Sequence, residues 1–297
     1  MFIKFLYLHA ILSRKQLYPV RTGFYIAAAP DSGSCSGRKI CMTMLEAITA
    51  RKSIRSYDMD PLEDELLDDL VDFLSDLEPP ESKIDWNFDL LPLEDMCRVV
   101  NGVPRLQAPH YLVLRSEKIK GCLQNAGYLG EMAVLYLTTR GIATCWQGGL
   151  EAEKDFEDVL PYIIAIAFGR SDEPFRTSEA EFKRKKVSAL VTGTTKGYRM
   201  PVFEAARLAP SSMGLEPIRY TSFDNEITVY RGSKMGKIPA LAYMECVDAG
   251  VAMAHIEIAA KAEGYRVRYE KLSPAPTWKK YTYQMTLKLF PDGDTAG

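Results

Sequence analysis

Three short segments of this sequence carry side chains whose types and spacing could do chemistry. In the first, Arg51, Ser53 and Arg55 occupy alternate positions of the segment RKSIRSY. Because alternate residues of an extended chain point to one side, two guanidinium groups and a hydroxyl could converge there on a phosphate or a polyol. A solvated charged turn that follows a helix accounts for the same residues, and spacing alone favours this simpler interpretation.

The second segment is a turn rich in proline, serine and glycine. Pro210, Ser211, Ser212 and Gly214 follow the helical pattern of EAARLA. Their hydroxyl and backbone N–H groups suit the oxygen-rich edge of a ring. An ordinary turn between a helix and a strand is the alternative interpretation.

The third segment, TCWQGG, contains Trp146, Gly148 and Gly149. Adjacent glycines allow backbone amides to approach a flat ligand closely, and Trp146 could pack beside that ligand. Considered by itself, this segment is better explained as a tight turn with a core tryptophan.

The overall composition argues against several classes of protein. Lys and Arg number 37 against 39 Asp and Glu, which argues against a nucleic-acid-binding face over much of the surface. The six cysteines form no CxxC pair and the three histidines lie far apart, so we predict no metal site and reduced thiols in a cytoplasmic protein. The apolar run near the N-terminus is interrupted by Lys4 and His9 and is too short to span a bilayer, so no membrane partner is predicted.

The elements that must position these segments begin after a long extension. Residues 1–41 are predicted to be flexible, because their last part is rich in glycine and serine. A helix is predicted with Asp60 as its N-cap and Pro61 at its first position. The segment 78–108 has no sustained period, so it is predicted to be a long excursion with short strands.

The second part of the pattern is more regular. A strand is predicted at 110–114, and a mostly apolar helix that follows it ends at Gly141, where a residue without Cβ suits a left-handed cap. Two further apolar runs predict strands at 162–169 and 285–290. These strands flank the segments of interest.

A shift of the sequence by 123 positions brings similar residues together. It superimposes Asn125, Ala126, Gly127 and Gly141 on Asp248, Ala249, Gly250 and Gly264. The identities are few enough to arise by chance, but the shared period suggests a diverged duplication. Two copies in one chain could pack as a pseudo-dimer that holds a ligand between them.

In combination, five motifs resemble those of the FMN-dependent nitroreductase family. In chain order they are RKSIRSY, GIATCWQGG, IIAIAFGRS, RKKVSALV and EAARLAPSSMGLEPIRY, and they span most of the sequence after residue 41. The resemblance is to the single-chain branch, in which two nitroreductase-like halves are fused. It implies an α+β fold, a tandem pseudo-dimer of two α/β halves whose central antiparallel-type sheets are flanked by helices. The first half is expected at 42–190 and the second at 191–297.

The resemblance also implies a cofactor and its ligands. In the family's homodimers, FMN lies between an Arg-x-Ser-x-Arg segment of one subunit and a Pro-Ser-Ser segment of the other. The matching residues here lie in different halves and include the glycine turn expected near the flavin N5. The residues expected to bind FMN are Arg51, Ser53, Arg55, Trp146, Gly148, Gly149, Arg184, Lys185, Pro210, Ser211, Ser212 and Gly214. For Arg184 and Lys185, a solvated basic helix end is an equally good interpretation.

The second half departs from the family pattern Pro-Ser-x-x-Asn-x-Gln-Pro-Trp. Gly214 stands at the position of the Asn, Glu216 at that of the Gln and Ile218 at that of the Trp. The loss of the amide removes a contact that the family implies, and Glu216 adds an anion. The first half has no second Pro-Ser-Ser turn and the second half has no second Arg-x-Ser-x-Arg, so one FMN per chain is expected.

The activity implied by the resemblance is an FMN-dependent NAD(P)H oxidoreductase of nitroreductase type. NADH or NADPH would reduce FMN, and a small-molecule acceptor such as a nitroaromatic or a quinone would reoxidise it in a ping-pong mechanism. No side chain is expected to be catalytic, because the flavin N5 carries the hydride. Arg55 is the expected positive charge that stabilises the reduced N1–C2=O anion. Two alternatives remain: a non-catalytic FMN store or sensor, and a relic of the fold that binds no flavin. The chain is expected to be a monomer with an internal pseudo-dimer. Association of several such chains into a higher oligomer is the alternative.

Overall fold

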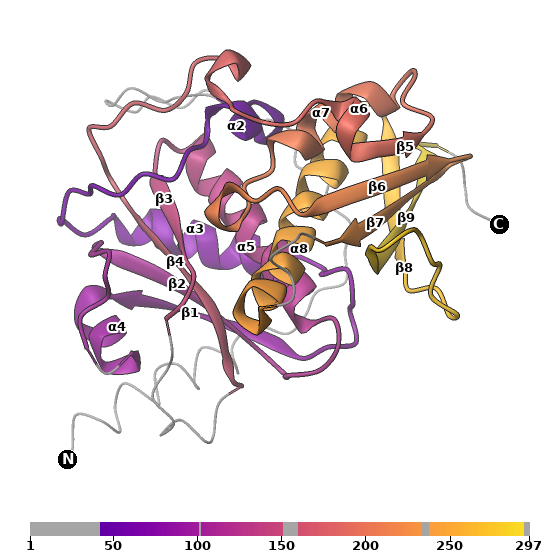
Figure 1. The fold of residues 1–297 in the computed structure, drawn as a ribbon. Helices are drawn as coiled ribbons and strands as arrows, with labels where there is room; N and C mark the ends of the chain where they lie inside the picture. The colour runs from indigo at the N-terminus through magenta and orange to yellow at the C-terminus, as the bar shows by residue number, and fades with distance from the viewer. Residues whose placement is uncertain (1–41, 101, 151–159, 233–237, 294–297) are drawn as a thin grey trace. The chain divides into compact units, whose positions relative to one another are not determined.

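Two long helices, α5 (Cys122–Thr139) and α8 (Pro239–Ala262), pack against each other between two sheets. The computed structural model describes residues 42–100, 102–150, 160–232 and 238–293. Both helices are buried over most of their length, because both are apolar on nearly every face. As Figure 1 shows, α5 lies on the first sheet and α8 lies on the second.

The first sheet has four antiparallel strands in the order β1-β2-β4-β3. Its strands are β1 (Trp86–Pro92), β2 (His110–Ser116), β3 (Ala143–Gln147) and β4 (Tyr162–Gly169). All of β2 and nearly all of β4 are buried, as their continuous apolar runs predict for strands covered on both faces. In the register of the sheet, Ile166 of β4 lies opposite Leu112 on one side and Trp146 on the other.

The second sheet has five strands in the order β5-β6-β7-β9-β8. The strands are β5 (Val191–Gly193), β6 (Ile218–Phe223), β7 (Glu226–Arg231), β8 (Tyr265–Glu270) and β9 (Thr282–Pro291). The four strands β6 to β9 are antiparallel, and β5 joins the edge parallel to β6. The order β6-β7-β9-β8 therefore repeats the order β1-β2-β4-β3 of the first sheet.

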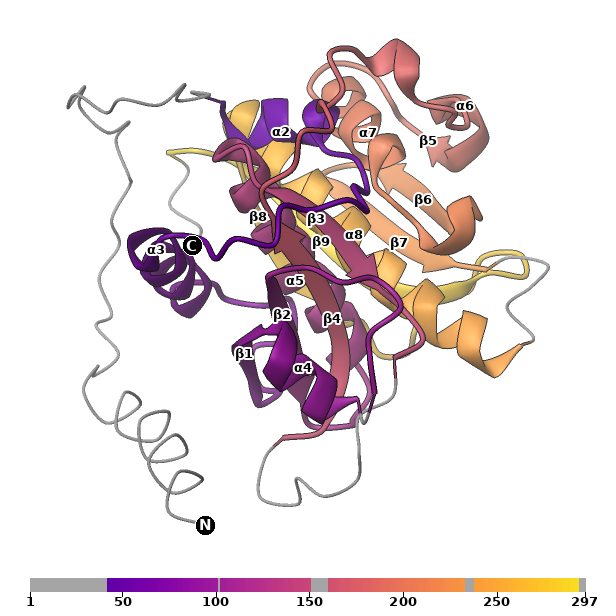
Figure 2. The same cartoon turned by 90° about the vertical axis from the view of Figure 1, so that its left-hand side faces the viewer.

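Shorter helices close the remaining sides of the two sheets. They are α2 (Met44–Ala50), α3 (Asp64–Ser75), α4 (Leu93–Val99), α6 (Val187–Leu190) and α7 (Arg199–Leu208), with the 3₁₀ turns η1 (Glu179–Glu181) and η2 (Ser212–Gly214). Helix α2 begins with a capping box, in which Thr43 and Glu46 each bond the backbone N–H of the other. Figure 2 shows α2 beside α7, and α2 also packs on α5 and α8.

The fold is the α+β arrangement that the sequence predicts, with antiparallel sheets flanked by helices. Gly141 and Gly264 follow the ends of α5 and α8 with φ of +73° and +80°, the left-handed conformation expected of them. The division between residues 190 and 191 stays a prediction, and the extension 1–41 lies outside the described residues. Within the described residues, no helix is both long and apolar enough to cross a membrane.

Two predictions about the first part of the chain are wrong. Asp60 is not an N-cap: helix α3 begins at Asp64, after Glu63. The reason is that Leu62 is buried and its backbone N–H donates to Nε2 of His110 over 2.8 Å, which keeps the segment extended up to Glu63. The segment 78–108 also holds a helix, α4, where only short strands were predicted. Seven residues are too few to display a helical period, although Glu94 and Arg98 form the i,i+4 ion pair of a helix.

Candidate functional site

A cleft of about 1160 Å³ lies between the first sheet and α8. Strand β3 and the segment beside it form one wall, and the N-terminal part of α8 with the turn after α7 forms the other. Eight of the residues predicted from the sequence line this cleft: Ser53, Arg55, Trp146, Gly148, Gly149, Pro210, Ser211 and Ser212. The fold therefore brings together the three segments that are far apart in the chain.

The Arg-x-Ser-x-Arg segment extends the first sheet. Ser53 pairs with Thr144 of β3 as a parallel bridge, and the N–H of Ile54 donates to the carbonyl of Thr144 over 3.1 Å. Ile54 is fully buried in the core, so its neighbours Ser53 and Arg55 face the cleft on the opposite side. The extended conformation is the one that the spacing required.

Arginine side chains gather beside Ser53, one of the residues that line the cleft. Arg51 is 3% exposed and donates to Oγ of Ser53 over 3.4 Å. Burial lowers the pKa of Arg51 below its ordinary value, and the positive charge of Arg184 lowers it further, while the negative charge of Glu131 opposes the change. The Nε–H groups of Arg51 and Arg184 are buried without a hydrogen-bond partner. Buried cations with unused donors are costly unless an anion compensates them.

A third arginine in this cluster was missed at the sequence level. Arg176 donates to the carbonyl of Arg51 through Nη1, its backbone N–H donates to the carbonyl of Ala50, and its guanidinium lies over the ring of Phe182. Burial lowers the pKa of Arg176, and Arg51 and Arg184 lower it further. Nothing in the local sequence signals this contact, because it joins residues 125 positions apart.

Four predicted residues, Arg51, Arg184, Lys185 and Gly214, are not among those that line the cleft. Lys185 is instead tied to Glu216, whose carboxylate accepts the Lys185 backbone N–H over 3.0 Å and lies 3.8 Å from Nζ. Gly214 lies in the turn η2 with φ of +67°, and the exposed Met213 lines the cleft next to it. Their part in binding FMN stays a prediction. Glu216, the anion that departs from the family pattern, holds this basic segment in place.

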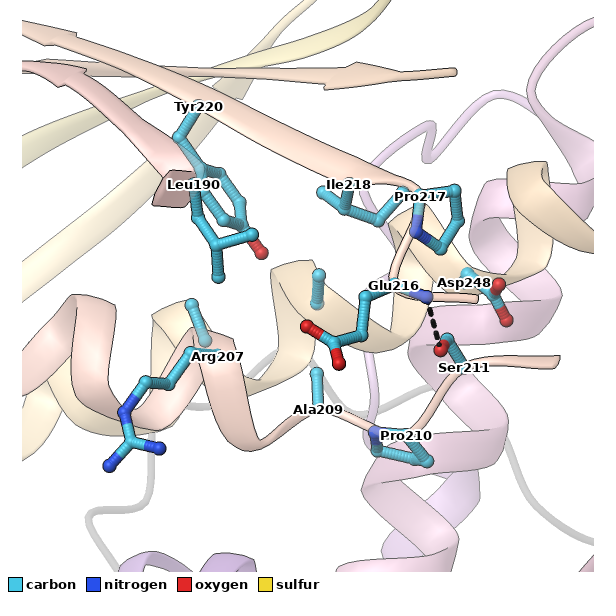
Figure 3. A pocket seen from close by; sticks show the side chains of 12 residues that line it. Leu190, Arg207, Ala209, Pro210, Ser211, Glu216, Pro217, Ile218, Tyr220 and Asp248 are labelled. Atoms are coloured by element: carbon cyan, nitrogen blue, oxygen red, sulfur yellow. Dashed lines mark hydrogen bonds between the residues drawn. The ribbon is translucent and has the colours of Figure 1, made fainter. Parts of the chain in front are cut away.

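The Pro-Ser-Ser turn is fixed by a buried carboxylate. Figure 3 shows Ser211, Glu216 and Asp248 close together where the end of α7 leads into β6. The Ser211 hydroxyl accepts the N–H of Glu216 over 3.0 Å, and Oδ1 of Asp248 accepts the N–H of Ser212 over the same distance. Asp248 is 5% exposed and lines the cleft. It was not predicted as a site residue, although the repeat singled it out as the counterpart of Asn125.

Burial raises the pKa of Asp248 from 3.8 to about 7, and the charge of Glu245 raises it as well, while the Ser212 N–H and Arg184 oppose the shift. A carboxyl whose pKa is raised by folding holds its proton more strongly in the folded state. Its contribution to stability is therefore complete below pH 3.8 and is lost as pH rises through 7. Above that pH, the folded protein carries a buried negative charge.

The Asp248→Asn variant is expected to lose this pH dependence. The Asn side chain keeps an oxygen that accepts the Ser212 N–H, as Asn125 does for Glu81, but it cannot ionise. We expect the variant to be more stable than the wild type by about 2 kcal/mol at pH 8, and to match it at pH 5. This is about half of what the full pKa shift implies, because only part of the linkage falls between pH 5 and pH 8: Asp248 of the unfolded chain is already ionised at pH 5. Urea unfolding at both pH values checks this, and equal pH dependence in the two proteins would contradict it.

The Trp146 indole is held from behind by α5. Its Nε1–H donates to Oε2 of Glu131 over 3.0 Å, and Gly130 leaves the space for the ring, because a Cβ there would lie 2.3 Å from it. The other oxygen of Glu131 lies 3.0 Å from Nε2 of His255, whose Nδ1 donates to the carbonyl of Ala205. Glu131 and His255 are both fully buried. Trp146 therefore occupies a fixed position beside the cleft.

The α8 wall of the cleft is mainly apolar. Met244, Val247 and Val251 line it, and Met244 would lie 3.2 Å from a Cβ added to Gly148. Tyr243 joins α8 to the first sheet by donating to the carbonyl of Ile163 over 2.8 Å. Further along the cleft, the Tyr162 hydroxyl is buried without a partner. A flat, mostly apolar molecule with an anionic end fits these walls.

Other clusters that could do chemistry are few in the described residues. No group of three or more His, Cys, Asp or Glu there could hold a metal ion. Cys97, Cys122, Cys145 and Cys246 are free thiols, and Cys145 lines the cleft, where burial raises its pKa. His110 is stacked on Phe168 and accepts the Leu62 N–H, so it has a structural role.

Comparisons with known proteins agree with this architecture. The model of a family described as "Putative TM nitroreductase" matches residues 43–260. The crystal structure of a "putative nitroreductase" from Thermotoga maritima is similar, with a TM-score of 0.60 and 21% identity over 89% of this chain and 100% of that chain. The curated proteins gave no match.

Two shorter solved structures match about half of this chain. One is an FMN-dependent nitroreductase from Clostridium difficile, with a TM-score of 0.38 and 17% identity over 46% of this chain and 93% of that chain. The other is a nitroreductase with bound FMN from Desulfitobacterium hafniense, with a TM-score of 0.38 and 16% identity over 49% of this chain and 100% of that chain.

The family match includes every residue that lines the cleft, from Ser53 to Val251, together with the whole first sheet and α5. The Thermotoga structure corresponds to this chain over its own full length, so the likeness extends to both sheets. The chain belongs to the nitroreductase family that this model describes.

Proposed function

We propose that the chain is an FMN-dependent oxidoreductase that uses NADH or NADPH to reduce a small-molecule acceptor, such as a nitroaromatic or a quinone. Membership of the nitroreductase family supports a general oxidoreductase role. The observation that carries the FMN assignment is the pair of buried, unpartnered guanidinium N–H groups of Arg51 and Arg184 beside a mostly apolar cleft. A flavin mononucleotide combines a phosphate with a flat ring system, and these residues fit both parts.

The residues that line the cleft and those beside it have distinct tasks in this proposal. Arg51 and Arg184 bind the phosphate, for which their unused donors are suited. The ring is held between β3 with its glycine turn at Gly148 and the apolar face of α8. Trp146, fixed by Glu131, helps to exclude water from that region. Asp248 acts indirectly, because it positions the Ser211–Ser212 turn.

Bound FMN supplies the hydride chemistry, and the protein orients it and tunes its charge. Arg55 lines the cleft as a cation with an exposed side chain, which we assign to the stabilisation of negative charge on the reduced cofactor. No side chain of the cleft is required as a proton donor in this scheme. The cleft volume of about 1160 Å³ exceeds the roughly 300–1,000 Å³ of most ligand pockets, which leaves room for one further molecule beside FMN. Donor and acceptor would then use this space in turn.

The visible absorption spectrum of the purified protein tests the proposal. We expect flavin bands, either as isolated or after incubation with FMN, and bleaching of these bands when NADH or NADPH is added without oxygen. Restoration of the bands by a quinone would complete the cycle. Bands that persist with both nicotinamides would favour a store or sensor of FMN, and a protein that takes up no FMN would contradict the assignment of the cleft.

A further inference from the structure

Helices α5 and α8 cross with an approximate two-fold symmetry that is visible at single atoms. A Cβ added to Gly127 would lie 2.0 Å from the carbonyl oxygen of Val247, and a Cβ added to Gly250 would lie 2.0 Å from that of Gln124. Gly127 and Gly250 are 123 positions apart, and so are Gln124 and Val247. Each helix therefore makes the same contact with the other. Residues that are 123 positions apart in the sequence occupy equivalent positions in this helix pair.

The turn that borders the cleft has a symmetry counterpart as well. Asp248 accepts the N–H of Ser212, and Asn125, 123 positions earlier, accepts the N–H of Glu81 over 3.0 Å. Both segments contain proline just before the bonded residue: Pro79 and Pro80 precede Glu81, and Pro210 and Ser211 precede Ser212. The segment around Glu81 is thus the first-half counterpart of the Pro-Ser-Ser turn.

The other wall of the cleft is repeated by the second sheet. Strand β8 pairs with β9 at the edge of its sheet as β3 pairs with β4. The shift of 123 places Tyr269 at the position of Trp146 and Lys271 at that of Gly148. Lys271 directly follows β8, just as Gly148 directly follows β3. The described residues therefore contain counterparts of both walls of the cleft.

Larger side chains stand in this second region than in the first. Four residues that line the cleft, Gly148, Ser212, Val247 and Val251, correspond to Lys271, Glu81, Gln124 and Tyr128. One pair differs in the opposite direction: Met244, which lines the cleft, corresponds to the smaller Gly121. Ile84 fills the space beside Gly121, because a Cβ added there would lie 2.9 Å from Cδ1 of Ile84.

These larger side chains bond to one another across the region. Nζ of Lys271 lies 3.5 Å from Oε1 of Glu81 and also donates to the carbonyl of Gln284. Nε2 of Gln124 donates to Oε1 of Gln284 over 2.6 Å. Lys271 and Glu81 stand where Gly148 and Ser212 border the cleft, so their ion pair spans the space that corresponds to the ligand site. Behind it, the hydroxyls of Tyr128 and Tyr269 both donate to Glu257.

We propose that this region is a second copy of the flavin cleft that its own side chains close, with the Lys271–Glu81 ion pair as the closing contact. The inference rests on the proposed function for the identity of the ligand, but the closure itself is a property of the folded chain. One chain then has one working cleft, and the second copy serves as a polar support between the two sheets.

A double-mutant cycle on the protein without flavin tests the closing contact. Lys271→Ala, Glu81→Ala and the double variant are compared with the wild type by urea unfolding. We expect the unfolding equilibrium constants to show a coupling of at least threefold, because both side chains are about three-quarters buried. The matched control is the exposed pair Arg98–Glu94, for which we expect less than twofold. A coupling no larger than that of the control would overturn the proposal.

Flavin stoichiometry tests the consequence for binding. Quantitative release of FMN is expected to give one FMN per chain in the wild type and in the Lys271→Ala/Glu81→Ala variant alike. Two FMN per chain in the wild type, or loss of FMN from the variant, would overturn the closed cleft. Absence of FMN from the wild type would instead contradict the proposed function, while the coupling still measures the closure.

Discussion

Replacement of Arg51 and Arg184 together by alanine is expected to weaken FMN binding by about 4 kcal/mol, roughly a thousandfold in Kd. Each guanidinium has a buried Nε–H without a partner, and a hydrogen bond to a charged phosphate contributes more than a neutral one. Titration of the protein with FMN, followed by quenching of flavin fluorescence, measures the change. The exposed Arg98→Ala serves as the control variant and should leave Kd unchanged.

Riboflavin, which lacks the phosphate, separates the phosphate site from the ring site. Its affinity should change far less than that of FMN in the double variant. Urea unfolding of the protein without flavin is measured as well, because the substitutions remove the burial cost of two charges but also end the attraction of Arg51 to Glu131 and of Arg184 to Glu216 and Asp248. Equal losses for FMN and riboflavin would contradict the assignment of these two arginines to the phosphate.

Substitution of Gly250 by alanine is expected to lower the free energy of unfolding by about 3 kcal/mol or more. The new Cβ would lie 2.0 Å from the carbonyl oxygen of Gln124 and 2.6 Å from the N–H nitrogen of Tyr128, both of which are backbone atoms of α5. The two helices must move apart to admit it. This loss far exceeds the gain of roughly 1 kcal/mol that alanine brings to a helix in place of glycine.

Gly127→Ala should have a similar effect, because it meets the carbonyl of Val247 in the symmetric contact. Gly102→Ala is the matched control: no atom lies within 4 Å of its added Cβ, so its free energy of unfolding should change by less than about 0.5 kcal/mol. Urea unfolding of the three variants measures these differences. If the free energy of unfolding fell as little for the Gly127 and Gly250 variants as for the Gly102 variant, the two helices would separate at little cost, against this prediction.

Local signals predicted local structure well in this chain. The continuous apolar runs of β2 and β4 and the glycines that end α5 and α8 needed no knowledge of distant residues. The alternation in RKSIRSY likewise predicted an extended segment, because Ile54 had to be buried if its neighbours were to share the opposite side. The fold class followed from these elements and from the resemblance of five motifs.

Predictions failed or were missing where a distant partner decides the outcome. Asp60 has the residue type of an N-cap, but the imidazole of His110, 48 positions beyond Leu62, takes the Leu62 N–H. No local signal pointed to the contact between Glu131 and His255, because it spans 124 positions. Lys185 matched a motif, but its contact with Glu216, 31 positions away, had no local signal. Hydrophobic periodicity does not predict contacts between residues that lie far apart in the sequence.

The symmetric contact of α5 and α8 at Gly127 and Gly250 joins two similar units within one chain. This linkage affects how substitutions accumulate in each unit. In an assembly of two identical chains, a lysine at the position of Gly148 would enter both clefts at once, because symmetry copies every substitution. Within one chain the two positions are encoded separately, so in the proposed arrangement Lys271 and Glu81 change one copy and leave Gly148 and Ser212 of the other unchanged. Covalent linkage also keeps the two walls together at any dilution, since their association is intramolecular. In the two-copy arrangement that we propose, separate coding releases each copy from the constraints of the other, so one copy can specialise in binding and the other in holding the molecule together.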